Sequence, residues 1–521
     1  METRLISSPK TPHTSGTTFT SLPPYDVAHS TRKYCIFNLF LSGILSLAGL
    51  GFSTFLVSSH IGTHLRYSYP GRYETVGTNG YAMIPAPRPL TLALPLILNL
   101  LVSLSTDMLS YIHYVSLRWA LFHEGRLCFN SNLRIFTSAR KTPANGKFTN
   151  FISAVLLVMA YTGASQSLSS SEWYASDYPS YYRQKGLIID GVAVLLLSVG
   201  LLGQVLISTW CLCGSRGQIL SWSASPLNTA LACLHEEIFS HQPGRGMMPV
   251  HSALLPAQPT QPQPKQQAMR KAYPATKPIH RFLAAMFLFT LAVAFVVFGL
   301  VLKLDIAITK ASFKFFDNGG DSSTFFNVGG PTWPPQLISF CAFLFVALIL
   351  SFMTLTLHCA ELLVNIKRDE LIWRAASSDE GAHTSSPALK SATRVWQWWF
   401  LFILKPVAHW LLGATGIFIT VGVGGDIMIT FNPIPLFVLS GATALLFAFA
   451  TILIWRQPSG PQPSAYGHLQ TLVDLVDDWG VGAEGRLWWG AKGIDTDGIG
   501  VVGTSANRRL LNPLNPDIFY Y

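Results

Sequence analysis

Eight apolar segments of about 20 residues or more set the fold of this 521-residue chain. A helix needs about 20 mainly apolar residues to cross a hydrocarbon core of ~30 Å. Backbone groups in lipid must be paired within the protein, and no series of short alternating strands is present, so we expect helices. The sequence therefore predicts an all-α polytopic membrane protein. The predicted spans are 34–56, 90–111, 150–168, 187–211, 282–302, 336–364, 398–421 and 435–455.

Composition agrees with a chain that is largely surrounded by lipid. Charged residues make up 12% and hydrophobic residues 50% of the chain, whereas a soluble domain carries roughly a quarter charged residues. The third segment carries Thr162, Ser165 and Gln166 in its outer half, so it could dip or tilt in the membrane rather than cross it squarely. The residues before position 34 are polar, so we expect the first helix to act as its own insertion signal.

The distribution of basic residues predicts the orientation in the membrane. Of the 36 Lys and Arg residues, most fall before the first span, in 112–149, 212–281 and 365–397, and after the last span. Such loops are normally cytoplasmic, so we expect both termini inside. This bias also accounts for the net charge of +10 without a nucleic-acid partner. The exceptions are Arg66, Arg72, Arg88, Arg183, Lys185, Lys303, Lys310, Lys314 and, within a span, Lys405.

The chain divides at a cytoplasmic loop. We expect a disordered tail over 1–33, a four-helix half over 34–211, a loop over 212–281, a second four-helix half over 282–455 and a tail over 456–521. Ser225 and Pro226 are a typical helix start, and 242–279 is a flexible Pro/Gln-rich linker. The tail should contain a helix over 466–479 and a hairpin of 486–489 with 499–504, docked under the bundle. No sequence repeat relates the halves.

A few ionisable residues inside the spans are the candidate functional site. Lys405 and His409 share one face of the seventh helix, and Lys405 lies roughly 12 Å deep at 1.5 Å per residue. Asp107, His358 and Glu361 also lie in the inner half of their helices. This cluster could serve as a structural clamp, a proton or ion relay, or a site for a charged ligand or lipid headgroup. We favour the clamp, since an unpaired charge at that depth would be neutralised.

Enzyme motifs are not found. The histidines at His235 and His241 lack the spacing of a zinc protease, the Asp495 segment lacks the glutamate of a calcium loop, and Gly498-x-Gly500-x-x-Gly503 has no βαβ unit around it. We therefore predict no catalytic residue, no cofactor and no metal site. The seven cysteines do not suggest disulfides. Membrane lipids are the expected partners, with proteins bound through the cytoplasmic tails as a further option; Leu22–Tyr25 loosely resembles the proline-tyrosine motif that WW domains bind.

Six segments spread over most of the chain carry a resemblance to known sequences. They are 116–126 (SLRWALFHEGR), 129–134 (FNSNLR), 228–234 (NTALACL), 467–479 (GHLQTLVDLVDDW), 489–493 (WGAKG) and 503–505 (GTS). Together they resemble a family of uncharacterised multi-spanning membrane proteins of filamentous ascomycete fungi. The resemblance implies a membrane architecture and a fungal source, but it transfers no catalytic residue.

Two functional interpretations follow from the sequence. The preferred one is a non-enzymatic structural, scaffold or sensor-like membrane protein, and the alternative is a transporter or channel whose polar path passes Asp107, Glu361, Lys405 and His409. The acidic residues Asp474, Asp477 and Asp478 should also dock on the basic loop around Arg126 and Arg134, because the charges are opposite.

Overall fold

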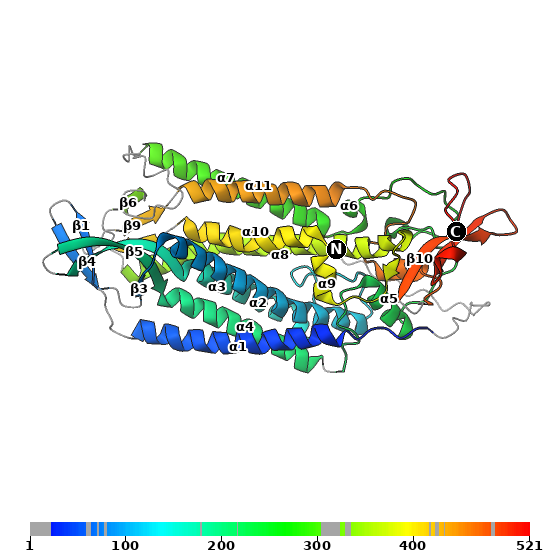
Figure 1. The fold of residues 1–521 in the computed structure, drawn as a ribbon, viewed down its shortest axis with the longest axis horizontal. Helices are drawn as coiled ribbons and strands as arrows, with labels where there is room; N and C mark the ends of the chain where they lie inside the picture. The colour runs from blue at the N-terminus through cyan, green and yellow to red at the C-terminus, as the bar shows by residue number, and fades with distance from the viewer. Residues whose placement is uncertain are drawn as a thin grey trace.

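Eight long helices run side by side along the longest axis of the molecule (Figure 1). The computed structural model describes residues 22–58, 64–69, 72–77, 81–177, 180–215, 217–303, 324–328, 335–415, 418–421, 427–431, 433–480 and 485–521. The predicted all-α polytopic architecture is confirmed. The long helices are α1 (His29–Ser58), α2 (Arg88–His123), α3 (Lys147–Gln166), α4 (Gly191–Gly214), α7 (Thr276–Lys303), α8 (Pro335–Arg374), α10 (Trp396–Ala414) and α11 (Pro433–Trp455).

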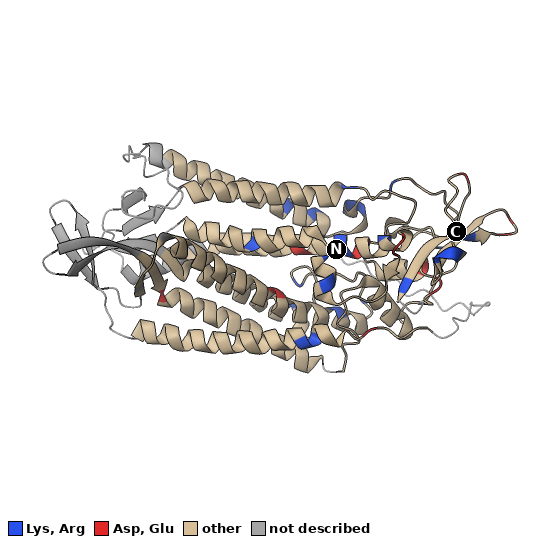
Figure 2. Ribbon diagram, viewed as in Figure 1, with Lys and Arg blue, Asp and Glu red and all other residues tan. Residues whose placement is uncertain are grey.

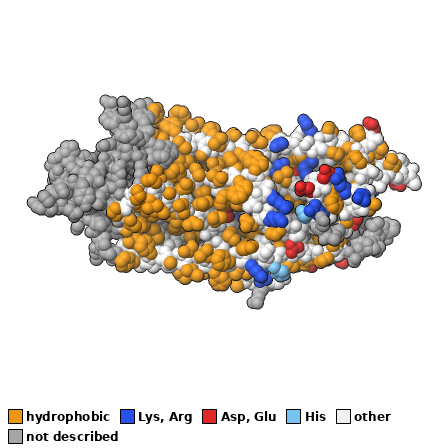
Figure 3. Space-filling view, viewed as in Figure 1, with side chains coloured by type: hydrophobic (Ala, Val, Ile, Leu, Met, Phe, Trp, Pro, Cys, Tyr) orange, Lys and Arg blue, Asp and Glu red, His pale blue; other side chains and the backbone are white. Residues whose placement is uncertain are grey.

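Seven of these helices are long and apolar enough to cross a membrane, and the uncertain third segment, α3, is one of them. The eighth, α10, is not among the seven, because Lys405, Pro406 and His409 interrupt its apolar run. It nevertheless packs inside the bundle, against α2, α3, α8 and α11. Apolar side chains cover the middle of the bundle on the face shown in Figure 3, as expected for a lipid-facing surface.

The helix ends differ from the predicted ones in most spans, and in two of them several residues of the predicted span lie outside the helix. The fourth span was predicted from 187, but α4 begins at Gly191, because the Asp190 carboxylate accepts hydrogen bonds from the amides of Val192 and Ala193 and caps the helix. The seventh was predicted to reach 421, but α10 ends at Ala414. In both cases the apolar residues beyond the helix belong to strands, which an apolar run alone does not distinguish from a helix.

One end of the bundle, the sheet end, carries three small antiparallel sheets (Figure 1). The first sheet pairs β1 (His64–Tyr69) with β2 (Arg72–Gly77). The second has the order β3-β5-β4, from β3 (Tyr81–Pro85), β4 (Leu168–Asp177) and β5 (Ser180–Asp190). The third has the order β6-β9-β8, from β6 (Thr324–Val328), β8 (Phe418–Val421) and β9 (Ile427–Phe431). The sequence did not predict these strands.

The two halves of the bundle repeat one topology. In each half, the loop between the first and second long helix supplies a strand, β3 or β6, and the loop between the third and fourth supplies a hairpin, β4–β5 or β8–β9. The single strand pairs with the second strand of the hairpin in both halves. Contacts between the halves are reciprocal as well, since α3 packs on α8 and α10 packs on α2. The structure thus contains two halves that share one topology and run in the same direction along the bundle.

The first half is held together by a very close approach of α3 and α4. A Cβ atom added to Gly163 would lie 2.3 Å from the backbone nitrogen of Leu197, and one added to Gly200 would lie 2.6 Å from that of Ala160. Glycine at both positions lets the two backbones touch, which is a common way to pack helices in lipid.

The other end, the tail end, is a compact cap built from three parts of the chain. It contains the short helices α5 (Pro226–His235), α6 (Met269–Ala272), α9 (Ala388–Thr393) and α12 (Leu469–Leu475). A sheet of order β11-β10-β7 joins β7 (Ala382–His383), β10 (Arg486–Ile494) and β11 (Gly500–Ser505). The predicted tail hairpin is therefore present, whereas the predicted helix over 466–479 is shorter. Lys and Arg gather at this end in Figure 2.

Segments predicted to be disordered or flexible are bound to this cap. The amide of Asp26 donates to the side chain of Asn228, and the Tyr25 ring meets the His235 ring at 5.5 Å, so 22–28 is ordered; residues 1–21 lie outside the described residues. In the predicted linker, Thr260 pairs with Tyr520 and Lys265 with Ser459. Ser225 and Pro226 do begin α5, but the Ser225 hydroxyl forms no capping bond. Backbone hydrogen bonds order these segments, and such bonds cannot be predicted from composition.

The tail docks on the basic loop, but not through the predicted charges. Asp474 pairs with Arg245 at 3.2 Å and Asp477 with Lys492 at 2.7 Å, while Arg126 pairs with Glu124. The contact with the loop is instead made by the backbone: the Asn130 amide donates to the Gly467 carbonyl at 2.8 Å, and the Leu469 amide to the Cys128 carbonyl at 2.9 Å. The expected electrostatic docking is therefore wrong, although the two segments do meet.

The inner end of α8 holds the tail in place. The Glu370 carboxylate is fully buried and accepts hydrogen bonds from the amides of Ala465 and Tyr466 at 2.9 and 2.8 Å. The Trp373 indole donates to the Pro463 carbonyl at 2.7 Å. These bonds tie the tail to the same helix that carries His358 and Glu361.

We expect acid to loosen α12 through His468. Its Nδ1 accepts a hydrogen bond from the Thr471 amide and caps the helix, and burial lowers the pKa of His468 from 6.5 to about 4. A depressed histidine pKa stabilises the fold fully above pH 6.5, and this stability is lost as the pH falls from 6.5 to 4. The shift corresponds to about 3 kcal/mol at most. Protease accessibility of the tail should therefore rise with acidification.

His468→Asn is the matched variant, because Asn caps helices but does not titrate. Burial also raises the pKa of Asp474, to about 6, and this acts in the opposite sense; it is present in both proteins and cancels in their comparison. An equal acid response of the wild type and the variant would contradict the assignment to His468.

Candidate functional site

The five predicted intramembrane residues come together where the two halves meet. Asp107 lies on α2, His358 and Glu361 lie on α8, and Lys405 and His409 lie on α10. The Lys405 ammonium is 2.7 Å from Asp107 Oδ1 and also contacts Glu361 Oε1. Lys405 is 2% exposed, so one cation links three helices from both halves in a buried position.

The histidines extend the cluster along the two helices. His358 Nδ1 donates to Glu361 Oε2 at 3.2 Å. His409 Nδ1 donates to the Lys405 carbonyl at 2.8 Å, and its Nε2 accepts from the Thr354 hydroxyl at 3.0 Å. The single proton of a neutral imidazole satisfies both bonds of His409.

Tyr161 of α3 belongs to the site, although the sequence did not single it out. Its ring stacks on His409 with centroids 4.0 Å apart and an interplanar angle of 22°. Its hydroxyl bonds to Thr106 at 3.0 Å and to Ser103 at 3.2 Å. The polar neighbours Thr162 and Ser165 were the available signal, since they mark a span that is not purely lipid-facing. Polar contacts thus continue from the cluster towards the sheet end.

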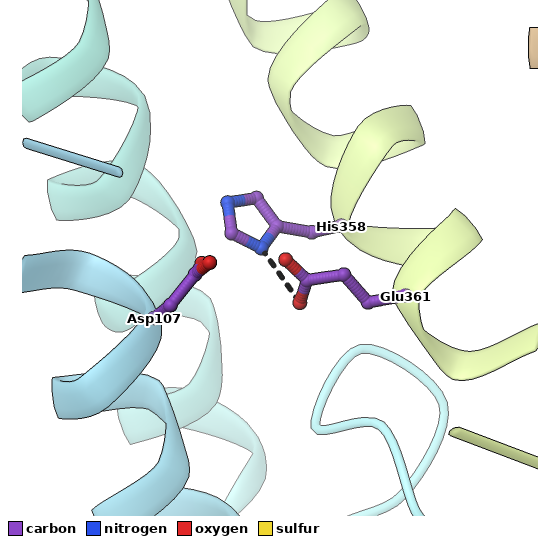
Figure 4. Close-up of side chains that lie close together, drawn as sticks. All are labelled: Asp107, His358 and Glu361. Carbon is purple, nitrogen blue, oxygen red and sulfur yellow. Dashed lines mark hydrogen bonds and ion pairs between the residues drawn. The ribbon is translucent and has the colours of Figure 1, made fainter. Parts of the chain in front are cut away.

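Figure 4 shows Asp107, His358 and Glu361 converging from α2 and α8. One ligand atom from each lies within 4.8 Å of the others, which is close enough to hold a metal ion. However, both carboxylates already bind the Lys405 ammonium. The cation that these carboxylates bind is therefore the Lys405 ammonium, and an added metal ion would have to displace Lys405 from its two partners.

A cavity of about 120 Å³ extends from the cluster towards the tail end. Its walls extend along α2 from Asp107 to Leu117 and along α8 from Leu355 to Arg368, and the loop 132–135 closes one side. The side chains of Asp107 and Glu361 keep 32% and 27% of their surface exposed, whereas Lys405 keeps 2%. The two carboxylates therefore face the cavity, and the lysine lies behind them.

Arg134 is a second cation at this cavity. Its Nη1 donates to the Ser153 hydroxyl at 2.5 Å and contacts His113 Nδ1 at 3.3 Å. Among the described residues no carboxylate pairs with it. We expected Arg134 to bind the acidic tail, and this expectation is wrong, because its loop folds into the bundle.

The charges of the site do not cancel locally. With neutral imidazoles, Asp107, Glu361 and Lys405 carry one excess negative charge, at the wall of the cavity. Such a group can take up a proton or attract a cationic group without breaking the fold.

Comparison with protein-family models, with curated proteins and with solved structures finds no match to this chain. The resemblance to a fungal membrane family therefore stays a prediction.

Proposed function

We propose that this protein is a non-enzymatic membrane transporter that moves a proton or a small solute past the Lys405 cluster. One observation carries the proposal: a buried lysine held by two carboxylates lies at the end of a cavity, between two halves of repeated topology. A purely structural clamp needs one carboxylate per lysine and no cavity. The cavity thus favours the transporter interpretation over the scaffold that the sequence favoured.

The repeat supports this proposal on independent grounds. Many transporters consist of two repeats with the substrate site at their interface near the middle of the membrane, and rocking of the repeats exposes the site to either side. Here the interface helices α2, α3, α8 and α10 all contribute to the cluster. A rocking motion would open the polar contacts of Tyr161 and His409 towards the sheet end while the cavity closes.

The tail end is cytoplasmic in this proposal. It carries the loops with most of the basic residues, as the positive-inside rule requires. Residues 22–28 bond to Ser221 and Asn228 at this end, and the C-terminal helix α12 packs on α5 in the same cap, which agrees with an even number of spans. The cavity would then open to the cytoplasm.

Glu361→Gln tests the proposal. Lys405 keeps Asp107 as its partner, so we expect folding to be retained, but the excess carboxylate is removed. In vesicles with an imposed pH gradient, the wild-type protein should carry a proton flux, reported by a pH-sensitive dye, and the variant should lose most of it. Glu236→Gln, at an exposed position of the tail end, is the control and should match the wild type. Equal flux through all three proteins, or none through the wild type, would reject proton transport.

A scaffold remains the second candidate, favoured by the three-helix tie of Lys405 and by the tail bound to α8. The scaffold interpretation predicts that the wild-type protein carries no flux, and that variants of Lys405 only lower the yield of folded protein.

A further inference from the structure

The cavity carries opposite charges at its two ends. At the deep end, Asp107 and Glu361 outnumber Lys405. Towards the tail end, its lining includes Arg134 and Arg368. Glu361 and Arg368 are seven residues, or about two turns, apart on α8, so they lie on the same face of this helix. The acidic and the basic residues thus line one continuous cavity.

At the cationic end, guanidinium nitrogens of Arg134 and Arg368 have no carboxylate partner among the described residues. Arg134 meets only the neutral partners Ser153 and His113 among the described residues. Burial lowers the pKa of Arg134 to about 10, so the guanidinium is still charged at neutral pH. Arg368 is 7% exposed; one of its nitrogens lies 3.4 Å from Asp369, and its buried Nε has no partner in the described part of the chain.

Asp369, the ion-pair partner of Arg368, is shared with other hydrogen-bond donors. The buried Asp369 carboxylate also accepts from Asn130 at 3.1 Å and from Ser131 at 2.8 Å. Arg368 and Asp369 together carry no net charge, so Arg134 leaves one positive charge at this end. The other end has one excess negative charge. A guanidinium that faces a cavity without a carboxylate is a ready site for a planar oxyanion.

We infer that the cavity binds a small zwitterion of the amino-acid class, with its ammonium group at Asp107 and Glu361 and its carboxylate at Arg134 and Arg368. This inference rests on the proposed function, because it names the solute of the same cavity. A zwitterion satisfies both ends and adds no net charge to the interior, whereas a simple cation or anion leaves one end unpaired. The cavity volume of about 120 Å³ suits a molecule of this size.

Binding to the purified full-length protein tests the inference. The probes are the twenty standard L-amino acids and γ-aminobutyrate, measured by calorimetry at neutral pH. We expect at least one to bind, and its deaminated and decarboxylated analogues to bind about tenfold more weakly or worse, because each lacks one charge-assisted bond. If none of the probes binds the folded wild-type protein, the inference is wrong. Binding of phosphoethanolamine without any amino acid would likewise reject it, in favour of a lipid headgroup.

Two variants should change selectivity in opposite ways. Arg134→Gln should abolish the preference for the zwitterion over its amine analogue, and Glu361→Gln the preference over its carboxylate analogue. Arg126→Gln is the control, because Arg126 lies in the same loop but pairs with Glu124 and does not line the cavity. If both cavity variants weaken all three ligands alike, the residues are only structural and the inference fails.

The outcomes separate this inference from the proposed function. Proton flux that depends on Glu361, without any amino-acid binding, rejects the zwitterion and keeps transport. Selective binding that the two variants alter as expected, without flux of protons or of the bound amino acid, keeps the site and rejects transport.

Discussion

Replacing Gly163 with alanine should destabilise the bundle by about 3 kcal/mol, at the upper end of overpacking effects. The added methyl group would lie 2.3 Å from Leu197 N and 2.6 Å from the Ala193 carbonyl oxygen. Both are backbone atoms, so no side chain can rotate away, and α3 must separate from α4. Thermal unfolding of the purified protein, followed by tryptophan fluorescence and by the fraction that stays monodisperse, measures the effect.

Gly51→Ala is the matched control for this prediction. Gly51 also lies within a long helix, α1, but a Cβ atom there would meet nothing within 4 Å. Alanine favours helix over glycine by roughly 0.5–1 kcal/mol, so this variant should be as stable as the wild type or slightly more stable. If Gly163→Ala also left stability unchanged, the close contact of α3 and α4 would be refuted.

Lys405→Met should cost about 2 kcal/mol of stability, less than a fully buried ion pair because both carboxylates are partly exposed to the cavity. Methionine keeps much of the aliphatic length, but Asp107 and Glu361 lose their common cation and repel each other. The yield of folded protein after detergent extraction and its unfolding temperature are the measurements.

Neutralising the carboxylates should restore the stability of that variant. We expect Lys405→Met combined with Glu361→Gln to recover part of the loss, and the further change Asp107→Asn to recover most of it, since neutral groups need no counterion. Glu361→Gln alone should cost little. An additive pattern, in which each change lowers stability further, would show that the three side chains do not act as one ion cluster.

The long helices and the ion cluster were predictable from the sequence, for related reasons. Apolar runs of spanning length have few alternatives to helices in lipid. Charged residues are so costly in such runs that Asp107, Glu361 and Lys405 stand out, and pairing is the simplest way to place them. The structure brings them together with His358 and His409, but their role in transport stays a proposal.

Other features were not predictable because they depend on partners that are distant in the sequence. Two strand pairs at the sheet end, β3 with β5 and β6 with β9, join loops about a hundred residues apart. Tyr161 resembled an ordinary apolar residue of a span until His409 was placed against it. The repeat could not be detected in the sequence, because many apolar side chains can face lipid equally well. Two halves can therefore share a topology without sequence similarity.

That repeat also shows what two unequal halves allow. In a symmetric pair of identical four-helix chains, every residue next to the central axis would occur twice. The present site is asymmetric: the stacked rings at its centre are a tyrosine from α3 and a histidine from the matching helix α10. Because the two halves differ, a single lysine from one half can lie between two carboxylates, one from each half.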